Sequence, residues 1–181
     1  MLTYDMASLF QHPLKFRARI PSAIVTFGGR PVGQCRIQVQ RRKGAQDVEN
    51  QDELLLSWDV ATLKSWCTDV EEEIAILLQR DEDRATRTEL AAVVVAVAVM
   101  AHIEPQTLFT RRSSTGTRHD YYLNETRDEM IEIAGRWEAG LPGLFEEKRD
   151  QSNLNRQLRK RWVSVTIVLQ SPRNRTERRH P

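Results

Sequence analysis

The sequence predicts an α+β protein in which an N-terminal β-hairpin and a helix precede an αβββαβ core. Alternation of apolar and polar residues over Gln34–Gln40 is typical of a half-buried strand. Apolar residues after Asp59 recur at helical spacing. Between Thr88 and Leu169, short apolar segments separated by turn residues have the order helix, three strands, helix, strand.

The chain is expected to divide at two points. With 181 residues it fits one domain, or one domain with an elaboration. We expect the hairpin and an acidic helix in residues 1–80, the αβββαβ core in residues 81–170, and a disordered basic tail in residues 171–181. The tail is rich in arginine and has no apolar residue.

The N-terminal part is predicted to hold short strands followed by a helix. The first residues, Met1–Leu14, are expected to form a loosely held arm. Asp59 has the side chain of a helix N-cap. The expected elements are strand Ala23–Phe27, a turn at Gly28-Gly29, strand Gln34–Gln40 paired with the first strand, a polar connector over 41–51, strand Glu53–Trp58 and helix Val60–Arg80.

The core begins with a helix that runs from about Asp83 to His102. Its apolar run, Leu90–Met100 (LAAVVVAVAVM), is too short to span a bilayer and is closed by His102 and Glu104. We therefore expect a buried central helix. The elements that follow are strands at Gln106–Arg111, His119–Leu123 and Glu129–Gly135, a polar helix at Leu144–Lys160 and a strand at Trp162–Leu169.

Composition limits the class of protein. Hydrophobic residues make up 40% of the chain and charged residues 29%, as in ordinary globular proteins, so a core needs no disulfide or metal. Cys35 and Cys67 are far apart and form no C-x-x-C pair, which indicates a reduced, cytoplasmic protein. No signal peptide is visible. No P-loop, GxSxG, HExxH or zinc spacing is present.

Charge is separated along the chain, although the net charge is only +2. Residues 15–43 contain basic but no acidic residues, residues 47–83 are acidic, and the last part of the chain is basic again. Such blocks indicate a polyanion partner, an oppositely charged protein partner, or both. The alternative is that the arginine-rich segments are solvated faces.

Two carboxylates stand out in the core. Asp120 lies on the second of its three predicted strands and Glu132 on the third. Carboxylates on neighbouring strands can hold a divalent cation against a phosphate. The alternative is that Asp120 and Glu132 pair with Arg118 and Arg136 as cross-strand ion pairs. If Ile131 and Ile133 face the core, Glu132 faces the other way.

The order of elements, with Asp120 and Glu132 on the second and third strands, resembles the PD-(D/E)xK or restriction-endonuclease-like superfamily over roughly residues 85–170. The resemblance implies that Asp120 and Glu132 bind Mg²⁺ and that a lysine assists. The position of that lysine is occupied by Ala134. Some members carry the basic residue on the following helix, which makes Lys148, with Gln151, the candidate. Glu89 is the candidate for a glutamate found on the first core helix of many members.

Basic residues near the two carboxylates are candidates for contacting nucleic acid, because phosphate contacts supply sequence-independent binding energy. The loop Ser113–Thr117 could bring backbone N–H groups to a phosphate, or it is a plain hairpin turn. The candidate nucleic-acid-binding residues are Arg111, Arg112, Arg118, Arg136, Arg159, Lys160 and Arg161.

The sequence leaves three functions open. The first is a non-catalytic or weakly active accessory subunit that binds nucleic acid and a larger protein, for example in bacterial defence against phages or plasmids. Ala134 in place of lysine favours it. The second is a magnesium-dependent DNA endonuclease that uses Asp120, Glu132 and Lys148. The third is a viral or phage structural or assembly protein. No membrane partner is expected.

Overall fold

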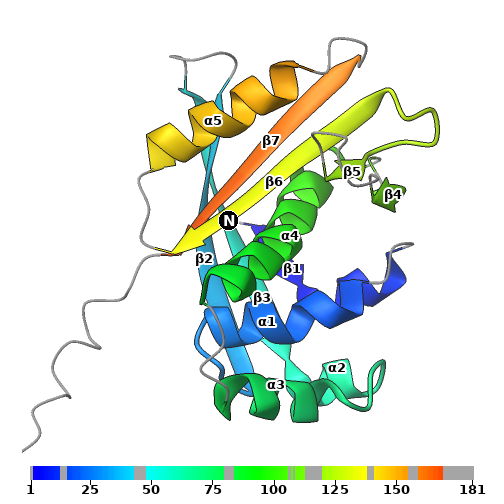
Figure 1. Cartoon of the computed structure of the whole chain (residues 1–181). Coiled ribbons are helices and arrows are strands. Elements are labelled where there is room, and N and C mark those ends of the chain that lie inside the picture. Colours follow the sequence, from blue (N-terminus) through cyan, green and yellow to red (C-terminus); the bar gives the residue numbers. More distant parts are fainter. Residues whose placement is uncertain are drawn as a thin grey trace, which may run out of the picture.

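The computed structural model describes residues 2–12, 16–42, 48–79, 84–105, 107, 109–112, 120–137, 141–154 and 159–168. Over these residues the chain is α+β, with five α-helices and two sheets (Figure 1). The predicted fold class is confirmed at this level.

The first sheet has the strand order β1-β3-β2. Its strands are β1 (Leu2–Asp5), β2 (Val32–Arg42) and β3 (Val48–Asp59), with β3 antiparallel to β2 and parallel to β1. The strands predicted at Gln34–Gln40 and Glu53–Trp58 are confirmed. The predicted hairpin partner is wrong, because β2 pairs with β3 and not with Ala23–Phe27.

Ala23–Phe27 is helical, not extended. It belongs to α1 (Ile20–Thr26), which follows a 3₁₀ helix at Phe16–Arg19 and has Pro21 in its first turn. Proline is favoured there because its ring fixes a helical φ and its missing N–H has no intrahelical acceptor to lose. Ile20, Ala23 and Ile24 lie on one helical face and are fully buried.

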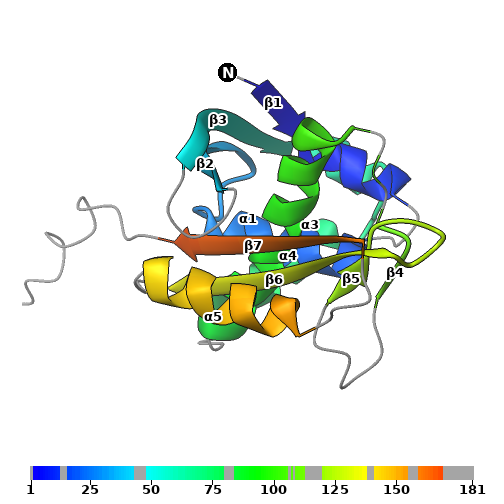
Figure 2. The same cartoon turned by 90° about the horizontal axis from the view of Figure 1, so that it is seen from above.

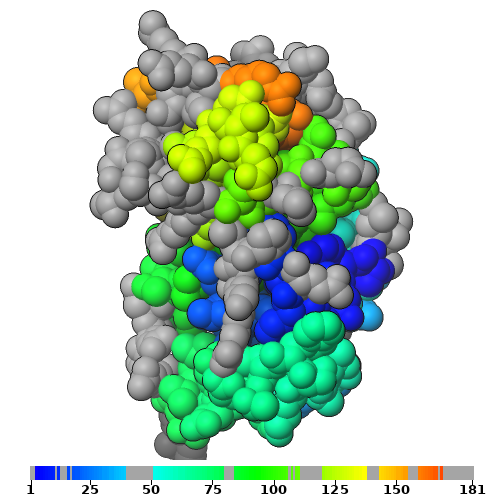
Figure 3. Space-filling model, turned by 90° about the vertical axis from the view of Figure 1, so that its right-hand side faces the viewer, coloured from blue at the N-terminus to red at the C-terminus, as the bar shows by residue number. Residues whose placement is uncertain are grey.

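The N-terminal segment is part of the core, so the prediction of a loose arm is wrong. After β1, a 3₁₀ helix at Met6–Gln11 is capped by Asp5, whose side chain accepts from the Ala7 N–H. Met6 and Leu9 are fully buried. On the face in Figure 3, the N-terminal residues (blue) lie between the α2 and α3 region (cyan to green) and the residues of the second sheet (yellow-green).

The helix predicted over Val60–Arg80 is interrupted. Asp59 caps its start as predicted, through a bond from the Ala61 N–H, but the chain forms α2 (Val60–Lys64) and α3 (Val70–Gln79). Trp66 lies in the break and is 55% exposed.

The second sheet and its helices follow the predicted order. The elements are α4 (Arg84–Ile103), β4 (Arg111–Arg112), β5 (Tyr121–Tyr122), β6 (Glu129–Trp137), α5 (Leu141–Asn153) and β7 (Lys160–Val168). The strands are ordered β4-β5-β6-β7, with β7 parallel to β6. The first strand is shorter than predicted, since Thr107, Phe109 and Thr110 are not in strand conformation and residues 106 and 108 lie outside the described residues.

Strand β6 is covered on both faces (Figures 1 and 2). Ile131 and Ile133 join the hydrophobic cluster that includes the buried residues of α4. Gly135 shares their face and lies so close to α4 that an added Cβ would meet the Thr88 carbonyl oxygen at 2.3 Å. Glu132, on the opposite face, contacts α5 through Lys148. The second face of β6 is therefore the one that carries the polar candidate site.

Helix α4 lies at the centre of the molecule. By length and composition it could cross a bilayer, yet 56% of its most apolar window is buried inside the protein. One hydrophobic cluster joins α4 to buried residues of both sheets and of the N-terminal segment.

Candidate functional site

Asp120 lies directly across from Glu132 at the end of β5. The β5–β6 register pairs Tyr121 with Ile131, so continuing it by one residue places Asp120 opposite Glu132. The Asp120 N–H donates to the Ile131 carbonyl at 3.1 Å, and its Oδ2 accepts from the Ile133 N–H at 2.7 Å. These two bonds flank Glu132 and hold both carboxylates on one face of the sheet.

Glu132 is buried beneath α5 and bonded to Lys148. Only 6% of Glu132 is exposed, and the Lys148 ammonium donates to its Oε1 at 2.8 Å. The same ammonium donates to Gln151 Oε1 at 2.9 Å, one helical turn further along α5. Lys148 is thus held between β6 and α5. It places an ammonium group on the face of β6 where Ala134, at the position expected for a lysine, supplies none.

The second carboxylate oxygen, Glu132 Oε2, is buried and has no hydrogen-bond partner among the described residues. Burial is the main cause that raises the Glu132 pKa, and the negative charge of Asp120 raises it further, while the hydrogen bond and charge of Lys148 oppose both. Two facing carboxylates with one ammonium are a costly arrangement in a partly dry site, and perturbed groups of this kind are enriched at functional sites.

The donor set suits Mg²⁺ better than a metal that prefers nitrogen or sulfur. Mg²⁺ takes oxygen ligands and is commonly held by one or two carboxylates, with water or substrate phosphate completing its shell. Glu132 Oε2 is a buried acceptor with no partner among the described residues, and Asp120 supplies a second carboxylate beside it. Among the described residues no group of three or more His, Cys, Asp or Glu could hold a metal. The described residues therefore fit a Mg²⁺ ion held by two carboxylates and water or phosphate, and they do not fit a metal ion held by protein side chains alone.

Several predicted residues lie outside this group. Glu89 is exposed on α4, next to Thr88, which packs on the opposite face of β6. Arg118 and the loop Ser113–Thr117 lie outside the described residues, as do the side chains of Arg111 and Arg112. Arg161 is exposed on β7 and also takes part in an interaction.

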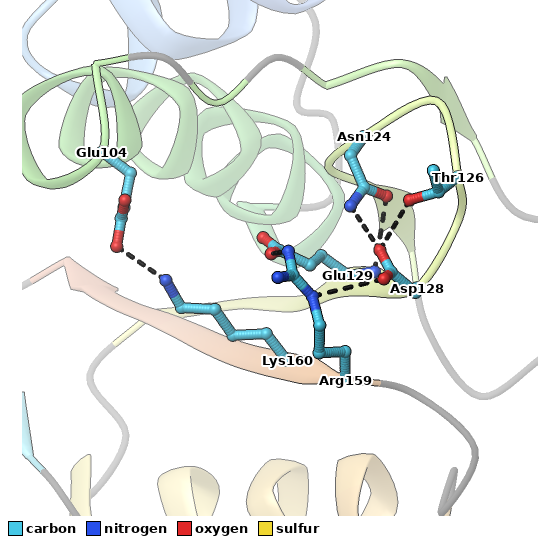
Figure 4. A network of polar contacts seen from close by, with 7 residues as sticks. All are labelled: Glu104, Asn124, Thr126, Asp128, Glu129, Arg159 and Lys160. Atoms are coloured by element: carbon cyan, nitrogen blue, oxygen red, sulfur yellow. Dashed lines mark hydrogen bonds and ion pairs between the residues drawn. The ribbon is translucent and has the colours of Figure 1, made fainter.

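Arg159 and Lys160 serve a structural network (Figure 4). Arg159 forms ion pairs with Asp128 at 3.2 Å and with Glu129, and its backbone N–H donates to the Asp128 carbonyl. Lys160 Nζ lies 2.6 Å from Glu104 and 4.5 Å from the centre of the Trp162 ring. These contacts attach the start of β7 to the β5–β6 turn and to the end of α4.

The turn itself is organised by Asp128. Its Oδ1 accepts from Asn124 Nδ2 at 2.5 Å and from Thr126 Oγ1 at 2.7 Å. The bonds from Thr126 and Asn124 lower the Asp128 pKa, so this carboxylate stays ionised beside Arg159. The turn keeps β5 and β6 in register, which in turn keeps Asp120 opposite Glu132.

Arg136 pairs with Glu147 of α5 at 3.5 Å, and both side chains are about half exposed. An exposed pair of this length is worth little, so Arg136 can exchange Glu147 for another anion. Arg136 therefore has a weak ion pair beside α5, whereas Arg159 and Lys160 each have at least two side-chain contacts.

Sequence reasoning missed the role of the Ile133 N–H in orienting Asp120. A strand sequence alone gives no sign of where a peptide N–H finds its acceptor. Comparison of the chain with protein-family models, with curated proteins and with solved structures found no significant match.

Proposed function

We propose that the protein is a magnesium-dependent phosphodiesterase that cleaves DNA at the group formed by Asp120, Glu132 and Lys148. The observation that carries this proposal is the buried Glu132. Its Oε2 has no partner in the part of the chain that the structure describes, its Oε1 accepts from an ammonium, and Asp120 lies opposite. Because Lys148 supplies a cation from α5, Ala134 at the strand position no longer argues against activity.

Each residue has a distinct role in this proposal. Asp120 and Glu132 would hold the cation, and the Ile133 N–H orients Asp120. Lys148, held by Gln151, would donate to a phosphate oxygen or orient the attacking water. A bound Mg²⁺ would stabilise charge on the phosphate and lower the pKa of bound water.

The arrangement of elements also supports the proposal. The order α4-β4-β5-β6-α5-β7, with β7 parallel to β6, agrees with the resemblance to the restriction-endonuclease-like superfamily. Fold likeness by itself says little about activity, so the proposal rests on the side chains.

The test is cleavage of plasmid and linear DNA with Mg²⁺ or Mn²⁺ by the wild type, Glu132→Gln and Lys148→Met. We expect each substitution to slow cleavage by about 100-fold or more, as loss of one electrostatic group in an active site does. The matched control is Glu147→Gln, which neutralises an exposed carboxylate on the same helix and should retain activity. Circular dichroism checks that every variant is folded.

The proposed site would be wrong if Glu147→Gln lost activity together with Glu132→Gln and Lys148→Met. It would also be wrong if the wild type cleaved DNA and none of these variants lost activity. A second readout is the shift in melting temperature on adding Mg²⁺, which binding to the folded state produces by mass action. That shift should disappear in Asp120→Asn and persist in Glu147→Gln.

One observation favours the second candidate, an accessory subunit without activity. Lys148 already donates to Glu132 and to Gln151, which leaves it fewer donors for a phosphate oxygen or an attacking water. A folded wild type that binds DNA in a salt-dependent manner but never cleaves it would support this function.

A further inference from the structure

Strand β7 forms one edge of the second sheet. It stands last in the order β4-β5-β6-β7, and within the described residues its ladder partner is β6 alone. Along Lys160–Val168 the backbone N–H and C=O groups of alternate residues therefore point to the outer side, where no described strand pairs with them. Such a row is a template for another strand.

The sequence of β7 does not protect this edge. From Trp162 to Val168 (WVSVTIV) it has no charge, proline or glycine and is rich in β-branched residues, which favour strand pairing. The edges of the first sheet differ. There β2 carries Arg36 near its middle, and β1 has only four residues. Natural sheets blunt open edges with such charges or with short strands.

We propose that β7 pairs antiparallel with β7 of a second copy of this chain, about a two-fold axis at Ser164. The strand is self-complementary in this arrangement, because the symmetric segment Val163-Ser164-Val165 sets each valine opposite a valine of the other copy. The basic residues Lys160 and Arg161 lie opposite Val168 and Ile167. A parallel pairing in register would instead set like charges side by side.

Helix α5 adds a second layer to this interface. It packs on β7 as well as on β6 (Figures 1 and 2). Val163 and Val165 are in register with Glu132 and Ala134, so they share the face that α5 covers. A two-fold axis at Ser164, perpendicular to the sheet, sets the two α5 helices on the same face of the joined sheet. Leu154, which follows α5, is 60% exposed. A stable interface buries more than about 1,000 Å², which a strand pair needs a second layer to reach.

The test is sedimentation equilibrium of the full chain over a range of concentrations. We expect a dimer for the wild type and, for Ser164→Lys, dissociation at least about tenfold stronger, because two ammonium groups would face each other at the axis. The matched control is Gln34→Lys, the same kind of change on the exposed edge strand β2, which should leave the dimer intact. Circular dichroism distinguishes lost pairing from lost folding.

A second variant tests the register without weakening the strand. In a Cys35→Ser background, Ser164→Cys should give a covalent dimer on mild oxidation, since directly opposite residues come within disulfide reach. Gln34→Cys in the same background should not. A wild type that remains monomeric at high concentration overturns the proposal. So does a dimer that Gln34→Lys breaks and Ser164→Lys does not, or a Ser164→Cys chain that fails to cross-link.

Discussion

At the scale of single residues, Lys148 holds the candidate site together. Replacing it by methionine leaves Glu132 buried beside Asp120 without a cation. We expect Lys148→Met to lower the free energy of unfolding by about 2 kcal/mol, because an uncompensated buried charge is costly. Adding Glu132→Gln to this variant removes that charge and should restore part of the loss. Urea denaturation at neutral pH measures both changes.

The chain offers a control for this prediction in the pair formed by Lys64 and Glu71. Lys64 Nζ and Glu71 Oε2 are 2.6 Å apart, but both side chains are more than half exposed. Lys64→Met should therefore change stability little, since solvent screens exposed pairs. Equal losses in Lys64→Met and Lys148→Met would mean that burial of Glu132 does not matter.

His12 gives stability a dependence on pH. Its Nε2 accepts from the Phe109 N–H at 3.3 Å and its ring packs against Phe16 and Phe109. Burial lowers the His12 pKa below its ordinary value of 6.5. Below pH 6.5, His12 therefore binds a proton more readily in the unfolded chain than in the folded chain. The His12 contribution is complete above pH 6.5 and is lost as the pH falls towards the folded pKa.

We expect the wild type to lose more stability between pH 8 and pH 5 than His12→Gln, whose amide oxygen can still accept the Phe109 N–H. Urea denaturation at both pH values measures the difference. The same pH dependence in both proteins would assign it to other groups.

The sequence could predict part of the site. Asp120 and Glu132 are chosen from their places on the second and third predicted strands. Lys148 with Gln151 is implied by the resemblance to a superfamily in which some members carry the basic residue on the following helix. The engagement of Arg159 and Lys160 could not be predicted, because their partners are distant in sequence: Lys160 and Glu104 are 56 residues apart. An arginine in a basic block looks the same whether it is free for phosphate or paired across a turn.

At the scale of elements, tertiary packing determined the secondary structure of two segments whose local sequence predicts something else. Ala23–Phe27 (AIVTF) has four β-favouring residues, yet α1 forms because its Ile20, Ala23 and Ile24 fill the core at helical spacing. The break between α2 and α3 was hidden for a similar reason. Leu63, Val70 and Ile74 are all buried, so the apolar period runs through a turn as if the helix were continuous.

The contact between α4 and β6 depends on Gly135. An added Cβ would meet the Thr88 carbonyl oxygen at 2.3 Å and Ala92 Cβ at 2.9 Å, and a backbone carbonyl inside a helix cannot step aside alone. We expect Gly135→Ala to destabilise the protein by about 1–3 kcal/mol, the usual cost of overpacking. The control is Gly143→Ala on α5, where nothing lies within 4 Å and alanine favours the helix. Thermal denaturation of both variants compares them. Similar melting temperatures would show that α4 can move away from β6.

At the scale of the whole molecule, the N-terminal segment completes a core that reaches both sheets. The sequence predicts a boundary near residue 80, but Met6 and Leu9 belong to the same hydrophobic cluster as Ala91 and Ile131. That continuity could not be predicted, since a short segment such as MASLF carries no sign of what it packs against. A core without a gap should unfold as one unit.

In a continuous core, loss of packing near the N-terminus should weaken both sheets. Leu9 is fully buried, so Leu9→Ala should lower the free energy of unfolding by about 2–5 kcal/mol. In a background with Trp58→Phe and Trp66→Phe, fluorescence reports only on Trp137 and Trp162, which lie beyond residue 80. We expect Leu9→Ala to shift the unfolding midpoint seen by these tryptophans and by far-UV circular dichroism equally, because loss of packing near the N-terminus weakens the whole cooperative unit. Leu154→Ala, at a side chain that is 60% exposed, should shift neither midpoint by much. If Leu9→Ala moved the circular dichroism transition and left the tryptophan transition in place, residues 81–170 would fold independently and the continuous cluster would not couple the two sheets.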